Sequence, residues 1–196
     1  MATSVPAADP GLTRRQAELL DQLEALFLGE GFSRFTLEDL AVRLRCSKST
    51  LYALAGSKEQ LALRVVKHFF RKATAAVEAD TVVETDPARR VTAYLLAVSR
   101  ALVPAGPAFH RDLDAFPPGR EVYEHNTVLA AERVRGLIAD GVAQGRFREV
   151  HPALIADTVT TLMFRIGRGD TQRATGLDDA TAYRELAALL LHGIAL

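Results

Sequence analysis

The chain has 196 residues and carries 24 lysines and arginines against 24 aspartates and glutamates, so its formal net charge is +0. A neutral total excludes a uniformly basic surface of the kind that coats nucleic acid. Hydrophobic residues make up 48% and charged residues 24%, which is the balance of a folded protein rather than of a disordered one.

Cysteine content and hydropathy exclude further classes of protein. The single cysteine, Cys46, excludes an intramolecular disulfide and a cysteine-rich metal cluster. The longest uncharged stretches fall well short of the ~20 apolar residues of a membrane span, and the first eleven residues lack the pattern of a secretory signal. We expect no membrane partner, a cytoplasmic protein, and a flexible tail over residues 1–12.

The charge is unevenly distributed along the chain. Residues 13–72 hold eleven basic against seven acidic residues, a local net charge of +4, whereas residues 73–196 hold thirteen against sixteen, a net charge of −3. Asp9 adds −1 in the first twelve residues. All four lysines fall between positions 48 and 72. Such asymmetry indicates either a polyanion-binding end or a solvated helix face.

The basic segment begins with three helical patterns. A helix starts at Thr13, and Gly29 and Gly31 end it. A second helix follows Thr36, which is placed to cap it, and a third follows Ser47. Two helices of eight or nine residues joined by about three residues cannot lie side by side, so they cross steeply, as in a helix-turn-helix.

The rest of the chain also follows a helical pattern. A long amphipathic helix is predicted from Ser57 to about Asp80, and proline and glycine breaks then delimit the remaining helices. Their predicted ranges are 87–103, 108–115, 119–144, 152–167 and 178–194. No strand pattern or internal repeat is evident, so the predicted fold class is all-α with about nine helices.

The last two predicted helices are unusually apolar. Leucines 189, 190 and 191 cover most of a helix circumference, which a helix at the edge of a small monomer could not bury. We therefore expect a second copy of the chain to pack against 152–167 and 178–194.

Residues Arg45 to Tyr52 place small hydroxyl side chains, a lysine and a tyrosine around the start of the third helix. Small side chains allow a helix end to enter the major groove, and Lys, Ser, Thr and Tyr donate hydrogen bonds to phosphates and base edges. An ordinary hydroxyl-rich helix cap is the alternative interpretation.

The segment from Ala17 to Phe70 contains the runs Thr36-Leu37-Glu38-Asp39-Leu40-Ala41, Ser47-Lys48-Ser49-Thr50-Leu51-Tyr52 and Gly56-Ser57-Lys58-Glu59-Gln60-Leu61. These runs carry a resemblance to the DNA-binding domain of the TetR (tetracycline repressor-like) family of transcriptional regulators. It implies a homodimer that binds a palindromic DNA operator and responds to a small ligand, most often as a repressor. It also implies a DNA-binding domain over 13–56 and a ligand-binding and dimerisation domain over 57–196.

The resemblance assigns DNA contacts residue by residue. Thr36 and Lys58 would hold phosphates, Tyr52 would contact the backbone, and Lys48, Ser49 and Thr50 would form the leading edge of the recognition helix. Ser47, at the cap of this helix, is also counted among the DNA-binding residues. Ser49 stands where glycine or alanine is common and could add a base contact.

Other parts of this segment also depart from the family pattern. Arg45 replaces a turn glycine, which would strain a left-handed backbone by about 1 kcal/mol. Ala53-Leu54-Ala55 replaces an aromatic ending, which weakens the expected packing between the third and fourth helices. Cys46 replaces a small apolar residue, and we expect a buried inert thiol rather than a redox sensor, because no second cysteine exists.

A ligand cavity among the fourth to seventh helices is a further implication of the resemblance. The candidate lining residues are Phe69, Phe70, Tyr94, Phe109, His110, Phe116, Tyr123 and His125. Plain core packing is the alternative for each of them. We expect no metal site, since the five histidines show no i, i+4 pair and no adjacent carboxylate in a known ligand spacing, and no cofactor.

The chain has few features of the two other classes of function, an enzyme and a protein–protein adaptor. An enzyme is not expected, because the chain lacks a nucleophile elbow, a phosphate-binding glycine loop and paired carboxylates at catalytic spacing. A helical protein–protein adaptor without sequence-specific DNA binding is the alternative to a regulator.

Overall fold

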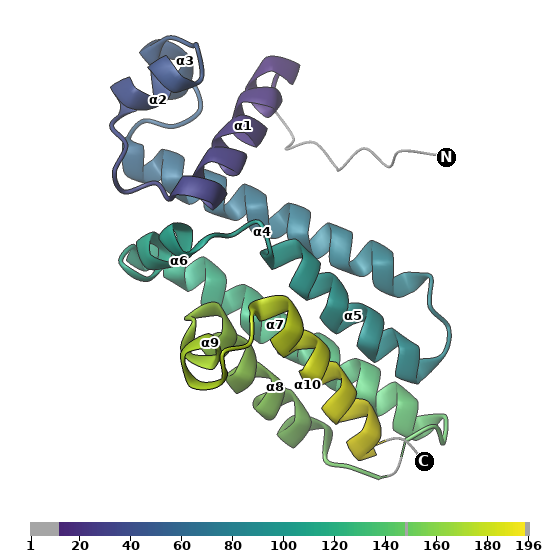
Figure 1. Cartoon of the computed structure of the whole chain (residues 1–196). Helices are drawn as coiled ribbons and strands as arrows, with labels where there is room; N and C mark the ends of the chain where they lie inside the picture. The colour runs from purple at the N-terminus through teal and green to yellow at the C-terminus, as the bar shows by residue number, and fades with distance from the viewer. Residues whose placement is uncertain (1–11, 148, 195–196) are drawn as a thin grey trace. The chain divides into compact units, whose positions relative to one another are not determined.

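A computed structural model describes residues 12–147 and 149–194, and its regular structure over these ranges consists of ten helices without a strand (Figure 1). The predicted all-α class is confirmed. The predicted tail, 1–12, lies outside the described residues except for its last position. The helices are α1 (Arg14–Glu30), α2 (Leu37–Arg43), α3 (Lys48–Tyr52), α4 (Lys58–Val82), α5 (Pro87–Leu102), α6 (Pro107–Asp114), α7 (Pro117–Ala143), α8 (Pro152–Gly167), α9 (Asp170–Thr175) and α10 (Asp179–Ile194).

Helix α9 accounts for the difference from the nine helices expected. It lies inside the segment 167–176 that sequence reasoning assigned to a break. Gly169 and Gly176 have φ of +71° and +77°, so left-handed residues stand on both sides of its six residues. A helix of six residues is too short for a periodic pattern of apolar residues to be recognised in the sequence.

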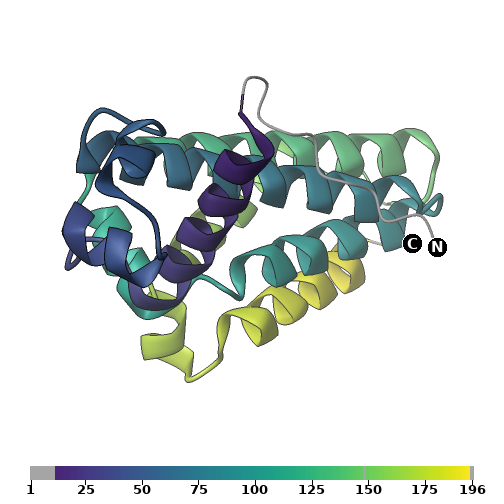
Figure 2. The same cartoon turned by 90° about the horizontal axis from the view of Figure 1, so that it is seen from above.

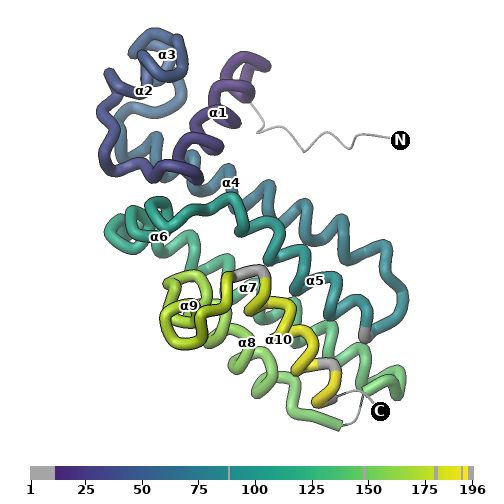
Figure 3. The backbone as a smooth tube through the Cα atoms, in the orientation of Figure 1, coloured from purple at the N-terminus to yellow at the C-terminus, as the bar shows by residue number. Residues whose placement is uncertain are grey.

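The described residues divide into two compact units. The N-terminal unit comprises the described residues up to Lys72 together with Pro104–Val122, and the C-terminal unit comprises Ala73–Val103 with the described residues from Tyr123 onward. Helices α4 and α7 each contribute residues to both units. The tube view in Figure 3 allows the chain to be followed through each unit.

The N-terminal unit is built around leucine and phenylalanine side chains of α1, α2, α3, α4 and α6. Leu20, Leu23, Leu40 and Leu51 are fully buried in it. Burying one such side chain contributes about 2 kcal/mol. Helix α1 ends at Glu30, because Gly31 leaves the helical conformation with a φ of +76°, whereas Gly29 stays within the helix.

Helices α5 and α10 pack against each other in the C-terminal unit and lie side by side in Figures 1 and 2. Its core includes Val91, Leu95, Ile138 and Tyr183. Near this core, the Arg133 guanidinium donates two hydrogen bonds of 3.0 and 2.9 Å to the Glu78 carboxylate, which ties α7 to α4. Bidentate pairing of this kind fixes the orientation of both side chains.

The apolar side chains of α8 and α10 are only partly buried within the C-terminal unit. Leu190 is buried, but Leu189 is 70% exposed and Leu154 is 63% exposed. The side chains of Leu191 and Ile194 lie outside the described part of the chain. Two large apolar side chains therefore face solvent on helices that pack together.

No single helix in the described ranges is long and apolar enough to cross a membrane. Among the described residues, the bent pair formed by Arg89–Leu102 of α5 and by α6 passes the test of length and composition together.

Candidate nucleic-acid interface

Helices α2 and α3 form the predicted helix-turn-helix, but both are shorter than the eight or nine residues expected. Helix α2 has seven residues and α3 has five. Helix α3 ends early because Ala53 and Leu54 continue as a turn, with the Leu54 N–H donating to the Leu51 carbonyl at 2.9 Å. Leu51 and Leu54 are both buried, and the Arg64 guanidinium of α4 donates to the Leu54 carbonyl at 2.5 Å. The hydrogen bond from Arg64 therefore ties the end of α3 to α4. It does so at Ala53-Leu54-Ala55, where the sequence lacks the aromatic residues expected to pack between the two helices.

The turn between α2 and α3 contains a left-handed residue. Arg45 has a φ of +51° and is the only non-glycine residue with positive φ in the described ranges. The left-handed conformation brings the Cβ atom close to the following carbonyl oxygen, so an arginine is strained where a glycine would not be. The strain anticipated from the sequence is therefore present.

Arg45→Gly is expected to raise the free energy of unfolding by about 0.5 kcal/mol, because relief of roughly 1 kcal/mol of strain exceeds the added entropy of the unfolded glycine chain. Chemical denaturation followed by circular dichroism measures the change. Val42→Gly, at an exposed position inside α2, is the control and should lower stability by about 0.5–1 kcal/mol. If Arg45→Gly and Val42→Gly lowered the free energy of unfolding equally, the backbone of Arg45 would not be strained.

Three hydroxyls gather at the start of α3. The Ser47 Oγ accepts a hydrogen bond from the Thr50 N–H at 3.1 Å and lies 2.7 Å from the Ser49 Oγ and 2.8 Å from the Thr50 Oγ1. Ser47 and Ser49 are exposed, and Thr50 is partly so. Ser47 therefore acts as the expected cap, while the cluster presents hydroxyl groups to solvent at the proposed leading edge.

Lys48, beside these hydroxyls, pairs with an acidic residue of α2. Its Nζ lies 2.9 Å from the Glu38 Oε2, and the two side chains are 50% and 72% exposed. An exposed pair of this kind contributes only about 0–1 kcal/mol, so a phosphate can readily replace the carboxylate. Glu38 therefore competes with a DNA phosphate for the Lys48 ammonium, and the sequence alone did not reveal this ion pair.

Glu38→Gln is expected to raise DNA affinity about 3–10-fold near 0.1 M salt, because it releases Lys48 and removes a negative charge beside the phosphates. Fluorescence anisotropy with a selected DNA site measures the effect, which should shrink as salt is raised. Glu18→Gln removes the same charge from an exposed pair with Arg14 on α1 and serves as the control. Unchanged affinity in Glu38→Gln would show that the pair does not compete with DNA.

The remaining DNA-contact candidates have defined positions in the same unit. Thr36 caps α2: its hydroxyl donates to the Asp39 Oδ2 at 2.7 Å and accepts from the Asp39 N–H at 3.1 Å. Hydrogen bonds from the Thr36 hydroxyl and N–H hold the pKa of Asp39 below its usual value. Tyr52 is 52% exposed, and the Lys58 Nζ donates to the Ser33 carbonyl at 2.6 Å.

The ligand-pocket candidates divide between the two units. Phe69, Phe70, Phe109, His110 and Phe116 belong to the N-terminal unit, and Tyr94, Tyr123 and His125 belong to the C-terminal unit.

The phenylalanines of the N-terminal unit pack closely. The Phe69 ring centroid lies 5.0 Å from that of Phe70 and 5.9 Å from that of Phe109, and Phe32, which sequence reasoning did not select, lies 5.7 Å from Phe116. The Phe69–Phe70 pair is tilted and the other two pairs are edge-on, and contacts at these distances are typical of a packed aromatic core.

Of the candidates in the C-terminal unit, Tyr94 and Tyr123 are buried, whereas His125 is exposed. Tyr94 is buried, and burial raises the pKa of its phenol well above the usual value. The ring of Tyr123 lies 6.0 Å from that of Phe164, and His125 is exposed. A separate open pocket of about 390 Å³ lies between α7 and the start of α8 and includes none of the candidates in its lining.

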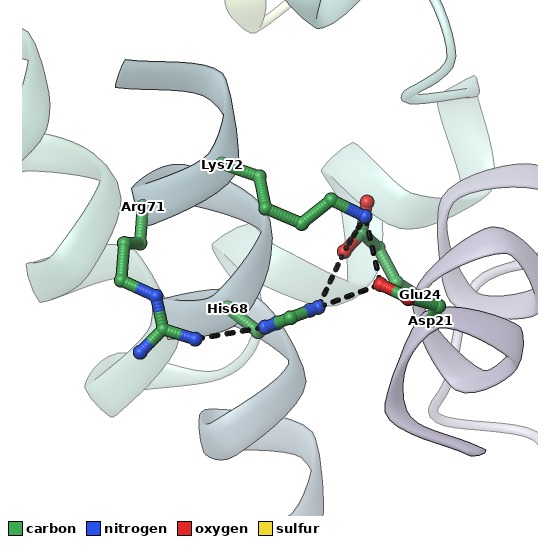
Figure 4. A network of polar contacts seen from close by, with 5 residues as sticks. All are labelled: Asp21, Glu24, His68, Arg71 and Lys72. Atoms are coloured by element: carbon green, nitrogen blue, oxygen red, sulfur yellow. Dashed lines mark hydrogen bonds and ion pairs between the residues drawn. The ribbon is translucent and has the colours of Figure 1, made fainter. Parts of the chain in front are cut away.

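Sequence reasoning missed a charged network in the N-terminal unit, shown in Figure 4. The His68 Nε2 lies 2.9 Å from the Asp21 Oδ1 and 3.3 Å from the Glu24 Oε2, and the Lys72 Nζ lies 2.8 and 3.2 Å from the same oxygens. Arg71 completes the network, with one guanidinium nitrogen 2.9 Å from the His68 Nδ1. The network joins α1 to α4, so no sequence spacing could reveal it.

The electrostatics of this network follow from its ion pairs. Burial favours the neutral forms, but the contacts with Lys72 and His68 outweigh it and lower the pKa of Asp21. Burial likewise opposes the charge of Lys72, and the two carboxylates nevertheless raise the pKa of Lys72. Ligand atoms of Asp21, Glu24 and His68 lie within 4.8 Å of one another, but the Lys72 ammonium already lies against both carboxylates. We assign the network to the packing of α1 on α4.

The helix-turn-helix lies in a segment that is similar to a known family of proteins. Residues 19–65 match the family model described as bacterial regulatory proteins, tetR family. This part of the chain is a tetR-family domain. It covers α2, α3, most of α1 and the first part of α4, and therefore includes every DNA-contact candidate. No curated protein matches the chain.

Solved structures share the fold over nearly the whole chain. A transcriptional regulator from Saccharomonospora viridis has a TM-score of 0.77 at 17% identity, with 94% of this chain and 100% of that chain covered. PfmR, a TetR family regulator from Thermus thermophilus, has a TM-score of 0.67 at 24% identity over 89% and 97% of the two chains.

A TetR/AcrR family regulator from Thermobifida fusca has a TM-score of 0.67 at 23% identity, over 92% of this chain and 98% of that one. These identities are low, so the likeness concerns the fold. A tetR-family domain followed by helices in this arrangement is the architecture of a DNA-binding transcriptional regulator.

Proposed function

We propose that this tetR-family protein binds a palindromic DNA operator as a homodimer, represses transcription there, and is released by a small-molecule effector. The observation that carries the proposal is the exposed edge of α3, where Lys48 and the hydroxyls of Ser47, Ser49 and Thr50 lie together in a tetR-family helix-turn-helix. This edge carries donors for phosphates and base edges, and it belongs to the segment with a net charge of +4.

The contacts fall into two classes with different expected effects. Lys48, Lys58, Thr36 and Tyr52 would bind the sugar–phosphate backbone and fix the register, whereas Ser49 and Thr50 would reach base edges. Losing a phosphate contact weakens binding to all sequences, while losing a base contact relaxes the choice of sequence at one position.

Selection of DNA sites from a random library tests the proposal. The protein should enrich a palindrome whose half-sites lie about one helical turn apart, roughly 34–36 Å, and its affinity should fall steeply with salt. Lys48→Ala should weaken binding, and the slope of log K against log salt concentration should become shallower by about 0.9, the contribution of one phosphate contact. Lys67→Ala, at an exposed position nine residues beyond Lys58 on α4, is the matched control. Weak binding without sequence preference would contradict the proposal that the protein binds a specific operator, and the protein–protein adaptor would then be the remaining hypothesis.

The proposed homodimer uses α8 and α10. Both helices belong to the C-terminal unit and pack together, and their exposed leucines, Leu154 and Leu189, provide apolar surface that a second copy could bury. A closed two-fold dimer would also supply two α3 helices for the two halves of a palindrome.

A small-molecule effector is the remaining part of the proposal. The regulator from Saccharomonospora viridis was solved in complex with choline, so a chain of this fold accommodates a small organic ligand. The candidate pocket residues named above stay candidates for such a site. A library of small molecules, screened for release of the selected DNA site, identifies the effector, and a reporter gene placed behind that site distinguishes repression from activation.

A further inference from the structure

The carboxylate of Asp112, on α6, holds the loop between α1 and α2. Its Oδ2 accepts hydrogen bonds from the N–H groups of Phe32 at 2.5 Å and Ser33 at 2.8 Å, and its Oδ1 accepts one from the Ser33 hydroxyl at 2.6 Å. Three donors on two adjacent residues therefore converge on one side chain that lies about 80 positions further along the chain.

The loop is fitted closely to α6 around this contact. A side chain at Gly31 would place its Cβ 2.5 Å from the Asp112 Oδ2, and the Gly106 N–H donates to the Leu28 carbonyl at 2.8 Å. Phe32 is buried against Phe109 and Phe116. Helix α6 thus sets the conformation of the chain that enters the helix-turn-helix.

The same loop holds Lys58. The Ser33 residue that donates twice to Asp112 also accepts the hydrogen bond of the Lys58 Nζ, at 2.6 Å. An ammonium group has three N–H donors, so this bond leaves two of them for a phosphate. A lysine side chain loses considerable rotamer freedom when it binds, and a lysine already held in place loses less.

Asp112 keeps its negative charge at neutral pH. Partial burial opposes the charge, but the hydrogen bonds from Ser33 and Phe32 outweigh it and lower the pKa of the Asp112 carboxyl. An ionised acceptor makes hydrogen bonds roughly twice as strong as a neutral one.

We propose that Asp112 is a positioning residue for DNA binding: by fixing Ser33, it holds the Lys58 ammonium ready for a phosphate. This inference rests on the proposed function, since Lys58 is a phosphate contact only if the domain binds DNA. It extends the DNA-binding machinery to a residue of α6, outside the 19–65 segment that matches the family.

A double-mutant cycle on DNA affinity tests the proposal. Asp112→Asn keeps the size of the side chain but loses its charge, and it should weaken binding to the selected site about 5–10-fold. The same change should weaken binding less than 2-fold when Lys58 is already alanine, because no ammonium is left to position. The slope of log K against log salt concentration should become shallower by about 0.9 in the Asp112→Asn protein, which is the contribution of one phosphate contact.

Two further variants keep the test independent of folding. Asp114→Asn removes the same charge from an exposed position on α6 and should leave affinity within 2-fold. Ser33→Ala deletes one hydrogen bond to Asp112 without a charge change and should weaken binding about 2–3-fold, again only when Lys58 is present. Thermal unfolding of each variant confirms that the domain is folded at the assay temperature.

The outcomes separate the two proposals. Equal losses with and without Lys58, or an unchanged salt dependence, would show that Asp112 supports only the fold and would overturn the positioning role. Failure of the unmutated protein to select any DNA sequence would instead overturn the proposed function, and the positioning role with it.

Discussion

Gly31→Ala is expected to lower the free energy of unfolding of the N-terminal unit by about 2–4 kcal/mol. Gly31 has a φ of +76° and a ψ of −179°, a backbone conformation that is essentially restricted to glycine and costs an alanine about 1–3 kcal/mol. The added methyl group would lie 2.5 Å from the Asp112 Oδ2 and 3.2 Å from the Ala108 carbonyl oxygen. The carboxylate must then move and lose its hydrogen bonds to the partly buried Phe32 N–H and the exposed Ser33 N–H, and the unpaired Phe32 donor alone costs about 1 kcal/mol or more. Chemical denaturation measures the loss.

Gly29→Ala, two residues earlier, is the matched control. Gly29 lies within α1, and nothing within 4 Å would meet its added methyl group. Alanine has the higher helix propensity, so this change should stabilise the unit by up to about 1 kcal/mol. Opposite signs at the two glycines would locate the effect in the turn and in the contact with α6. Similar values at both positions would contradict the close approach of Asp112.

Leu189→Asp is expected to convert the proposed dimer into monomers and to weaken binding to a palindromic site at least 100-fold. A charge placed in an apolar interface loses its hydration without a partner, and each monomer then binds only one half-site. Leu189 is 70% exposed, so its replacement should leave the fold of the free chain intact. Sedimentation velocity measures the association state, and anisotropy with whole and half sites measures the loss of affinity.

Val83→Asp provides the control for the added charge, because Val83 is 79% exposed and lies just beyond α4 rather than on α8 or α10. The control protein should remain a dimer with unchanged DNA affinity. A Leu189→Asp protein that stayed dimeric would place the interface elsewhere. A Leu189→Asp protein that became monomeric yet kept its affinity for the palindrome would show that DNA binding does not need the dimer.

The helices were largely predictable because their signals are local. The range predicted for α8, 152–167, agrees with Pro152–Gly167, since a proline at its first position and an apolar stripe mark it. Thr36 and Ser47 cap α2 and α3 as expected, and the strained turn at Arg45 was recognisable from a missing glycine. Helix α9 was not predicted, because its six residues are too few to show a period.

The contacts of the candidate site were much less predictable. Helical spacing places Thr36 and Asp39 together, but it cannot place His68 beside Asp21 or Asp112 beside Ser33, because the partners are brought together by packing between helices. For the same reason, sequence reasoning grouped the aromatic residues of 94–125 as one pocket lining, whereas the structure divides them between two units. Their assignment to a ligand site stays a prediction.

By itself, the sequence determined the all-α class, the helix-turn-helix, the basic character of residues 13–72 and the donors of α3, because propensity, caps and charge are carried by residues close together in the chain. Only the tertiary structure decided which charges meet. Lys48 lies against Glu38, Lys58 is held by Ser33, and α6 reaches that loop through Asp112. The physical reason is that hydrogen bonds and ion pairs act over a few ångströms, and only the packing of helices brings distant residues that close.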